Sequence, residues 1–349
     1  SLFLNIKIPD SVIELNSSIK VNFTINENLY TDEIFINETN ITKNKPIKEK
    51  ILSIKNINIH YEIFSPENKE EIKGKFLMIH GFAGSTFSFN RIAPLLARLG
   101  YLVVAIDLPN FGYSDRARIK FNSNCFADLI FNFINQFEES KLNSILKDYS
   151  LSKDPSLSEN FKKSKWNIVG HSMAGRILSI FTYKYKSMVN SLTLISPAFF
   201  GSTHFPVIAM LPPFNLFLYL YISSALQKVN FAKLLEKVYL RKPEDFEVEN
   251  YLKPLLIPGT FQNVIYMLDT PEDEKFKPQD ILNKIDLPVL LIWGKKDNIV
   301  PLKKSIKFID KIKDKKLIVI EDAGHNSMET HFDIVINKIL EYLAYLEYL

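Results

Sequence analysis

The chain has 349 residues, of which 46% are hydrophobic, enough for one large α/β domain with an insertion or for two domains. Its net charge of +4 is small for this length and the arginines form no cluster, so nucleic-acid binding is not indicated. Cys125 is the single cysteine, which excludes an internal disulfide and a cysteine-rich metal site.

Residues 1–46 are predicted to form an N-terminal extension with β character. Residues 12–15 and 19–25 alternate apolar and polar side chains, as half-buried strands do. The extension carries no recognisable catalytic pattern. The sequence starts at Ser1 without Met, which is compatible with a signal or membrane anchor removed before this residue. Cytoplasmic and membrane-associated locations therefore both stay open.

From residue 51 onward, strand-like and helix-like patterns alternate. Strands are predicted at 51–54, 57–63, 76–79, 101–106, 166–169, 192–195, 287–294 and 316–320. Helices are predicted at 92–99, 126–137, 176–181 and 332–346. The polar stretch 138–165 is expected to be a surface insertion. This alternation predicts an α/β fold with a doubly wound, mostly parallel sheet.

Residues 201–286 interrupt the alternation with helical segments, so the core is predicted to comprise 47–200 and 287–349. We expect the block to form a helical cap over the carboxyl edge of the sheet, where ligands bind in such folds. No charged residue occurs between Ser187 and Gln227, and the prolines within this segment make it a poor transmembrane helix. The segment is expected to line an apolar substrate pocket; a lid that touches a membrane surface is the alternative.

A serine motif stands between the predicted strand at 166–169 and the helix at 176–181. Its sequence is Gly-His-Ser-Met-Ala-Gly, with the serine at position 172. A strand, a sharp turn around a serine and a helix form a nucleophile elbow. Because the turn is strained, the residues two before and two after Ser172 must be small, and here they are Gly170 and Ala174.

Four motifs in order make the chain resemble the α/β-hydrolase superfamily, in particular its capped branch of esterases, lipases, carbon–carbon bond hydrolases and epoxide hydrolases. The resemblance covers about residues 50 to 349. The motifs are 80–82, 107–114, 170–175, and the pair 293–297 with 322–325. Asn110 stands where the family commonly has Gly, and Asn tolerates a positive φ better than most residues.

Chemistry and the resemblance together predict a catalytic triad of Ser172, Asp297 and His325. A serine hydroxyl needs a base to take its proton, and the base needs a carboxylate to hold its tautomer. Asp297 and His325 each follow a predicted strand, in loops that open toward the same sheet edge as Ser172. Their chain order is the one expected for this fold. A serine at the elbow, where epoxide hydrolases and haloalkane dehalogenases have Asp, implies attack on an acyl group.

The oxyanion of the tetrahedral intermediate needs hydrogen-bond donors. The resemblance implies the backbone N–H groups of Phe82 and Met173. No metal or organic cofactor is implied.

Other residues near these motifs are predicted to have structural roles. Asp322 shares the loop of the predicted base and is expected to orient it. His171 is expected to pack, His80 to brace the oxyanion loop, His60 to be structural, and His331 to lie on the surface.

The predicted function is hydrolysis of a carboxylic ester with an apolar or lipid-like acyl group through an acyl-enzyme. A carbon–carbon bond hydrolase acting on a vinylogous diketone has the same triad and a similar elbow. Polar groups in the cap discriminate the two, because a dienoate carboxylate needs a cation. A thioesterase, an amidase and a catalytically inactive binding scaffold are further alternatives. The sequence leaves the oligomeric state open.

Overall fold

The computed structural model describes residues 17–25, 28–36, 50–68, 72–150, 154–199, 224–268 and 270–348. The chain divides into two compact units, Ser1–Pro46 and Ile47–Leu349. In the first unit, β1 (Ser17–Ile25) and β2 (Asn28–Ile36) pair in antiparallel fashion. The strand predicted at 19–25 is confirmed. The sequence analysis did not predict β2, and the strand predicted at 12–15 lies outside the described residues.

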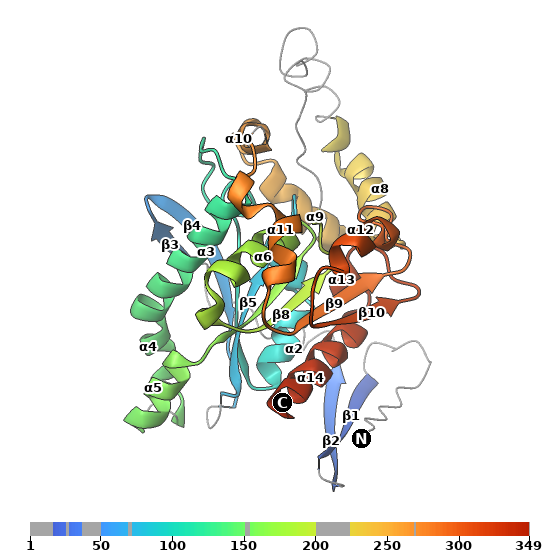
Figure 1. Ribbon diagram of the computed structural model, residues 1–349. Coiled ribbons are helices and arrows are strands. Elements are labelled where there is room, and N and C mark those ends of the chain that lie inside the picture. The colour runs from blue at the N-terminus through green and yellow to red at the C-terminus, as the bar shows by residue number, and fades with distance from the viewer. Residues whose placement is uncertain are drawn as a thin grey trace. The chain divides into compact units, whose positions relative to one another are not determined.

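An eight-stranded sheet in the order β10-β9-β8-β7-β5-β6-β4-β3 forms the centre of the second unit (Figure 1). Strands β5 to β10 pair in parallel, and β4 is antiparallel to both β6 and β3. The bounds are β3 (Lys50–Ile54), β4 (Ile57–Phe64), β5 (Gly74–Ile79), β6 (Tyr101–Ile106), β7 (Trp166–His171), β8 (Val189–Ile195), β9 (Val289–Gly294) and β10 (Lys315–Ile320). Each strand predicted for this unit is present, so the mostly parallel sheet is confirmed.

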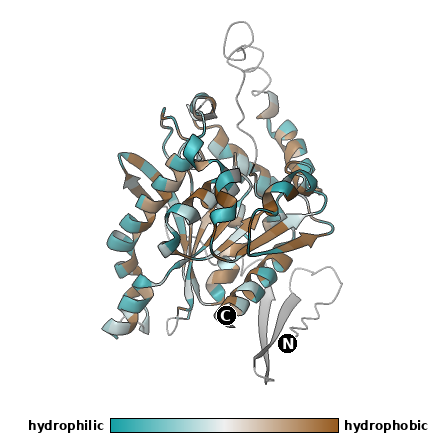
Figure 2. Cartoon of the chain, viewed as in Figure 1, coloured by the Kyte–Doolittle hydropathy of each residue, from teal (hydrophilic) through white to brown (hydrophobic). Residues whose placement is uncertain are grey.

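Helices cover both faces of the sheet. They include α2 (Ile92–Arg98), α3 (Ser123–Phe137), α6 (Ala174–Lys184), α12 (Leu302–Ile309) and α14 (Phe332–Tyr348). Helix α3 packs on α6, and α2 packs on α14. Along β5, Leu77 and Ile79 join the apolar cluster of α3 and α6, whereas Phe76 and Met78 are buried outside that cluster. This period-two alternation places the two helix pairs on opposite faces, and Figure 2 shows the hydrophobic strands between more polar helices.

The segment at 138–165 is exposed over most of its described residues, in line with the expected surface insertion. It forms η2 (Glu138–Leu142), α4 (Asn143–Leu146) and α5 (Pro155–Lys163), and it buries Leu142 and Leu146 in the core. Glu138 accepts hydrogen bonds from the fully buried ammonium of Lys75 at 2.6 Å and from the indole of Trp166 at 2.8 Å. One polar residue of the segment, Glu138, is thus the partner of a buried ammonium group.

The described part of the block between β8 and β9 is helical. It contains α8 (Lys228–Tyr239), α9 (Asp245–Leu255), α10 (Thr260–Leu268) and α11 (Pro278–Ile281), which we call the inserted helices. Most of the uncharged segment predicted to line the pocket, residues 200–223, lies outside the described residues. Among the helices that the structure does describe, none is long and apolar enough to cross a membrane.

Candidate active site

Ser172 lies in the sharp turn between β7 and α6, with a φ of 52°. This left-handed conformation is strained for a residue with a side chain. Neighbouring side chains leave no room for larger residues at Gly170 and Gly175, on either side of the turn. A methyl group on Gly170 would overlap Leu178 and come within 3.2 Å of Ala174 Cβ, and one on Gly175 would overlap Pro197. After the serine, the position that has no room for a side chain is therefore Gly175, whereas the methyl group of Ala174 is accommodated.

Hydrogen bonds from the neighbouring strand end hold the strained turn. The N–H of Ser172 donates to the carbonyl of Ile195 at 3.0 Å. The Ser172 carbonyl in turn accepts from the N–H groups of Gly175 at 2.9 Å and Ala198 at 2.8 Å. The scaffold therefore determines this backbone conformation, as expected where strain occurs at a functional site.

Asp297 and His325 form a buried pair, as predicted from the sequence. His325 Nδ1 lies 2.8 Å from Asp297 Oδ2. The other carboxylate oxygen accepts from the N–H groups of Ile299 at 2.9 Å and Val300 at 2.8 Å. A carboxylate only accepts hydrogen bonds, so Nδ1 of His325 carries the proton that faces it. Nε2 is then the ring nitrogen available to act as a base.

Asp322, the rival carboxylate, lies elsewhere. It forms an exposed ion pair with Lys296, with 2.6 Å between Oδ1 and Nζ. Asp322 and Lys296 come from the loops that follow β10 and β9, so this pair links those loops, in line with the expected orienting role.

His171 contacts the loop of His325 more directly than packing alone would require. The two imidazole centroids are 4.6 Å apart, and His171 Nε2 lies 3.1 Å from the carbonyl oxygen of His325. A carbonyl only accepts, so Nε2 of His171 must carry a proton. Burial, followed by the nearby His325, lowers the pKa of His171 well below its usual value. His171 is therefore a neutral donor.

Gly81 brings the loop after β5 against Ser172. A methyl group at Gly81 would lie 2.9 Å from Ser172 Cβ, closer than real contacts allow, and 3.0 Å from His171 Nδ1. The next two residues are Phe82, which is half exposed and packs edge-on against Phe111, and Ala83, which has a φ of 57°. Among the described residues, the N–H groups of Phe82 and Met173 have no hydrogen-bond acceptor.

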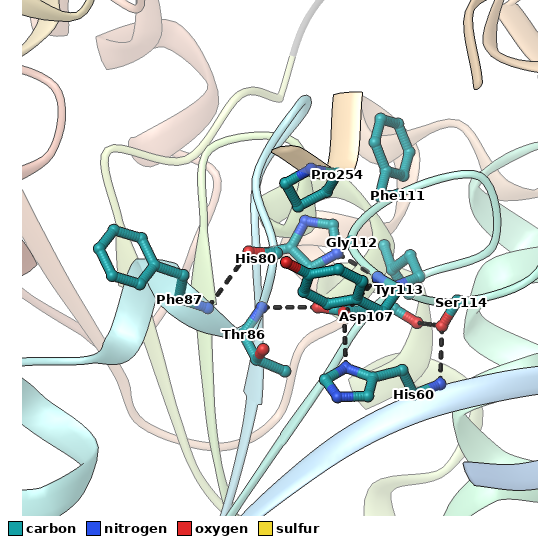
Figure 3. A network of polar contacts seen from close by, with 12 residues as sticks. His60, His80, Thr86, Phe87, Asp107, Phe111, Gly112, Tyr113, Ser114 and Pro254 are labelled. Carbon is teal, nitrogen blue, oxygen red and sulfur yellow. Dashed lines mark hydrogen bonds and ion pairs between the residues drawn. The ribbon is translucent and has the colours of Figure 1, made fainter. Parts of the chain in front are cut away.

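Asp107 is the centre of a buried network that the sequence analysis did not predict (Figure 3). One of its oxygens lies 2.7 Å from His60 Nδ1 and accepts from the N–H of Tyr113 at 2.8 Å. The other accepts from the N–H of Thr86 at 2.6 Å. At Gly112, which has a φ of 52°, a methyl group would overlap the Asp107 carboxylate. Asp107 therefore fixes the loop at 107–114 to β4 and to the short helix η1 (Thr86–Phe89).

His80 braces the same region. Its Nε2 accepts from the N–H of Leu108 at 3.0 Å, and its Nδ1 donates to the carbonyl of Gly81 at 2.6 Å. Burial lowers the pKa of His80, so the ring is neutral, and because both ring nitrogens are hydrogen-bonded, neither is free to act as a second base. His331, by contrast, is half buried, and its Nδ1 lies 2.9 Å from the Thr330 hydroxyl.

The arginines nearest the motifs bind the inserted helices to the core. Arg176, one turn after Ser172, pairs with Glu272 at 2.8 Å and donates to the Ser123 hydroxyl at 2.7 Å. Arg116 donates to the Thr260 hydroxyl at 2.8 Å and to the carbonyls of Gly112 and Pro254, each at 2.7 Å. In the described part of the chain, no group of three or more His, Cys, Asp or Glu side chains is placed to hold a metal ion.

A cavity lies beside the elbow, between the core and the inserted helices. Its apolar lining is Phe121, Phe126, Met173, Ile177 and Met267, and its polar lining is Asn122, Ser123, Thr270 and the Arg176–Glu272 pair. Met173 thus belongs both to the turn of Ser172 and to the lining of this cavity.

A family model described as the alpha/beta hydrolase fold matches residues 75–332. The uncharacterized hydrolase YugF of Bacillus subtilis (strain 168) is 25% identical over 297 residues, which cover 83% of this chain and 96% of YugF. The 2-hydroxy-6-oxononadienedioate/2-hydroxy-6-oxononatrienedioate hydrolase of Escherichia coli (strain K12) is 24% identical, over 77% of this chain and 86% of that enzyme. The monoacylglycerol lipase ABHD6 of Mus musculus is 23% identical, over 78% of this chain and 76% of the lipase.

The fold is also similar to solved structures. A bacterial membrane phospholipase A superposes with a TM-score of 0.63 at 21% identity, covering 86% of each chain. The family match covers most of the sequence and agrees with the mostly parallel sheet and the strained turn at Ser172. This chain therefore belongs to the α/β-hydrolase fold family and is a hydrolase of that fold.

Proposed function

We propose that this chain is a serine hydrolase that cleaves a carboxylic ester with an apolar acyl group through an acyl-enzyme intermediate. One observation carries the proposal. The strained Ser172 and the buried Asp297–His325 pair lie at the ends of β7, β9 and β10, at one edge of the sheet. A nucleophile, a base and an orienting acid so arranged are the parts that acyl transfer needs.

The mechanism follows from the roles that these groups can take. His325 Nε2 accepts the proton of the Ser172 hydroxyl as its oxygen attacks the ester carbonyl, and Asp297 stabilises the resulting imidazolium. The oxyanion accepts hydrogen bonds from the N–H groups of Phe82 and Met173. The imidazolium then gives its proton to the leaving alcohol. Water, activated by the same base, hydrolyses the acyl-enzyme and frees Ser172.

The apolar acyl preference rests on the surroundings of the elbow. Five apolar side chains line the cavity beside Met173, together with polar and charged ones, and residues 187–227 contain no charged side chain. A fatty acyl chain is bound mainly by burial of its apolar surface. The apolar side chains beside Met173 and the uncharged segment at 187–227 favour such burial. The likeness to a monoacylglycerol lipase agrees with a lipid-like ester but is too distant to assign one.

Carbon–carbon bond cleavage is the second candidate, because one relative is named for such a dienedioate substrate. A substrate of this kind carries carboxylate groups that need a cation. Arg176 is already paired with Glu272, and Arg116 already donates to carbonyls and a hydroxyl. Moving either side chain to a substrate would break a largely buried ion pair, in the case of Arg176, or several hydrogen bonds, in the case of Arg116. The arrangement therefore favours an uncharged ester, while thioesters and amides remain compatible with the same triad.

The test is hydrolysis of p-nitrophenyl esters of increasing acyl length, by the wild type and Ser172→Ala. Ser196→Ala is the matched control. Ser196 is also buried with a positive φ, at the end of β8, and its hydroxyl has no hydrogen-bond partner among the described residues. We expect Ser172→Ala to abolish both hydrolysis and labelling by a fluorophosphonate, and Ser196→Ala to retain both.

Each other result has a definite meaning. Labelling of Ser172 without hydrolysis of any ester would contradict the ester proposal and direct the search to dienedioate, thioester and amide substrates. A faster reaction with polar or charged esters than with medium-chain apolar ones would contradict the apolar pocket. Neither labelling nor hydrolysis by the folded wild type would leave an inactive binding scaffold.

A further inference from the structure

A buried polar cluster joins the inserted helices to the loop that carries His325. The Tyr251 hydroxyl, from α9, donates to Glu329 Oε1 at 2.6 Å and lies 3.0 Å from the Ser88 hydroxyl. Asn326 donates through Nδ2 to Glu329 Oε2 at 3.1 Å and lies 3.4 Å from the Tyr251 hydroxyl. Glu329 belongs to the short helix α13 (Ser327–Thr330), and Asn326 follows His325 directly.

We propose that Tyr251, Asn326 and Glu329 are positioning residues for His325, and that the inserted helices thereby set the geometry of the catalytic base. The inference rests on the proposed function, in which His325 is that base. None of the three side chains is assigned a role in bond making. Each acts through the backbone of the loop at 325–329.

A second contact from the inserted helices reaches the same loop. The N–H of His325 donates to the carbonyl of Val238, in the last turn of α8, at 3.3 Å. A methyl group at Gly324 would approach that carbonyl oxygen to 2.6 Å, so the two backbones are close. Leu240, which ends α8, has a φ of 59°, a conformation that the surrounding packing must enforce.

His325 is thus held from several sides, and the inserted helices supply one of them. Asp297 fixes the imidazole through Nδ1, and His171 contacts the carbonyl oxygen. The backbone N–H of His325 is held by Val238 of α8, and the next residue, Asn326, contacts Tyr251 of α9. The core alone therefore does not determine where the imidazole lies relative to Ser172.

Burial makes the cluster sensitive to the loss of one member. Glu329 is 3% exposed, and both its oxygens accept hydrogen bonds from the loop or from α9. Removal of the Tyr251 hydroxyl would leave one buried carboxylate oxygen without its donor, and the loop would shift to satisfy it. A displacement of about 1 Å at a catalytic group can lower the rate about 100-fold.

The experiment compares kcat and KM for a p-nitrophenyl ester in Tyr251→Phe, Glu329→Ala and Glu329→Gln. The rates are expressed per site titrated with the fluorophosphonate, so misfolded protein does not count. Tyr342→Phe is the matched control. Tyr342, on α14, is buried like Tyr251, but its hydroxyl has no hydrogen-bond partner in the described part of the chain.

We expect kcat to fall about 10- to 100-fold in Tyr251→Phe and in Glu329→Ala, while KM changes less than about 2-fold. The pseudo-first-order rate of fluorophosphonate labelling should fall in parallel, because it requires the same base. Glu329→Gln should recover part of the loss, since its amide oxygen can accept the bond from Tyr251. A merely structural role would lower the number of titrated sites but not the rate per site.

The inference is overturned if Tyr251→Phe and Glu329→Ala match the kcat per site of Tyr342→Phe within about 2-fold. It is also overturned if the loss appears entirely in KM, which would place these residues at the substrate. Failure of the proposed function looks different, because the wild type itself would then neither hydrolyse the ester nor be labelled.

Discussion

Replacement of Asp297 by Asn tests the assignment of the orienting acid, because it changes charge and hydrogen-bonding capacity but not size. The Asn oxygen would stay with the N–H groups of Ile299 and Val300, which now bind Oδ1 at 2.9 and 2.8 Å. The amide nitrogen would then face His325 Nδ1 in place of Oδ2, which lies 2.8 Å away. Because that nitrogen donates, Nδ1 must lose its proton and Nε2 must gain it.

The wrong tautomer blocks the reaction, since a protonated Nε2 cannot accept the proton of Ser172. The same substitution in a catalytic triad lowers kcat about 10⁴-fold, or about 5 kcal/mol of transition-state stabilisation. The assay is kcat/KM for a p-nitrophenyl ester between pH 6 and 9, per titrated site. Asp322→Asn, which removes only an exposed carboxylate paired with Lys296, is the control and should keep wild-type activity. A loss of less than about 10-fold in Asp297→Asn would refute the assignment.

Three further predictions concern stability, each measured by urea unfolding. Burial raises the pKa of Glu329 to about 7 from 4.5, against the opposing effect of Tyr239, Tyr251 and Asn326 and with help from Glu247. The folded state therefore keeps a proton that the unfolded state loses, so the free energy of unfolding falls as the pH rises from about 4.5 to 7, by about 3 kcal/mol. Glu329→Gln should remove this dependence, and equal pH slopes in both proteins would contradict the reasoning. Gly112→Ala should lower the free energy of unfolding by at least about 2 kcal/mol, because its φ is 52° and its methyl group would overlap Asp107; a neutral effect would show that the loop can move aside. Arg176→Gln should cost about 2 kcal/mol by leaving Glu272 unpaired in a largely buried site, and a double variant with Glu272→Gln should lose less than the sum of the single changes.

Much of the fold and the candidate triad could be predicted from the sequence because their signals are local. Buried parallel strands appear as short apolar runs, and a turn such as that at Ser172 requires small residues at fixed offsets. The order of Ser172, Asp297 and His325 along the chain needs no coordinates. Asp297 and His325 meet because the loops after adjacent parallel strands open at one edge.

Only the tertiary structure decided which distant groups meet. Asp107 and His60 are 47 residues apart, and Tyr251 and Glu329 are 78 apart. Contacts of this kind leave no periodicity in the sequence, since each polar side chain by itself resembles a solvated one. The pairing of Glu138 with the buried Lys75 was not predicted for the same reason, because the two residues are 63 apart in the chain. Local patterns determine elements and turns, whereas burial converts scattered polar residues into obligatory partners only once the chain has folded.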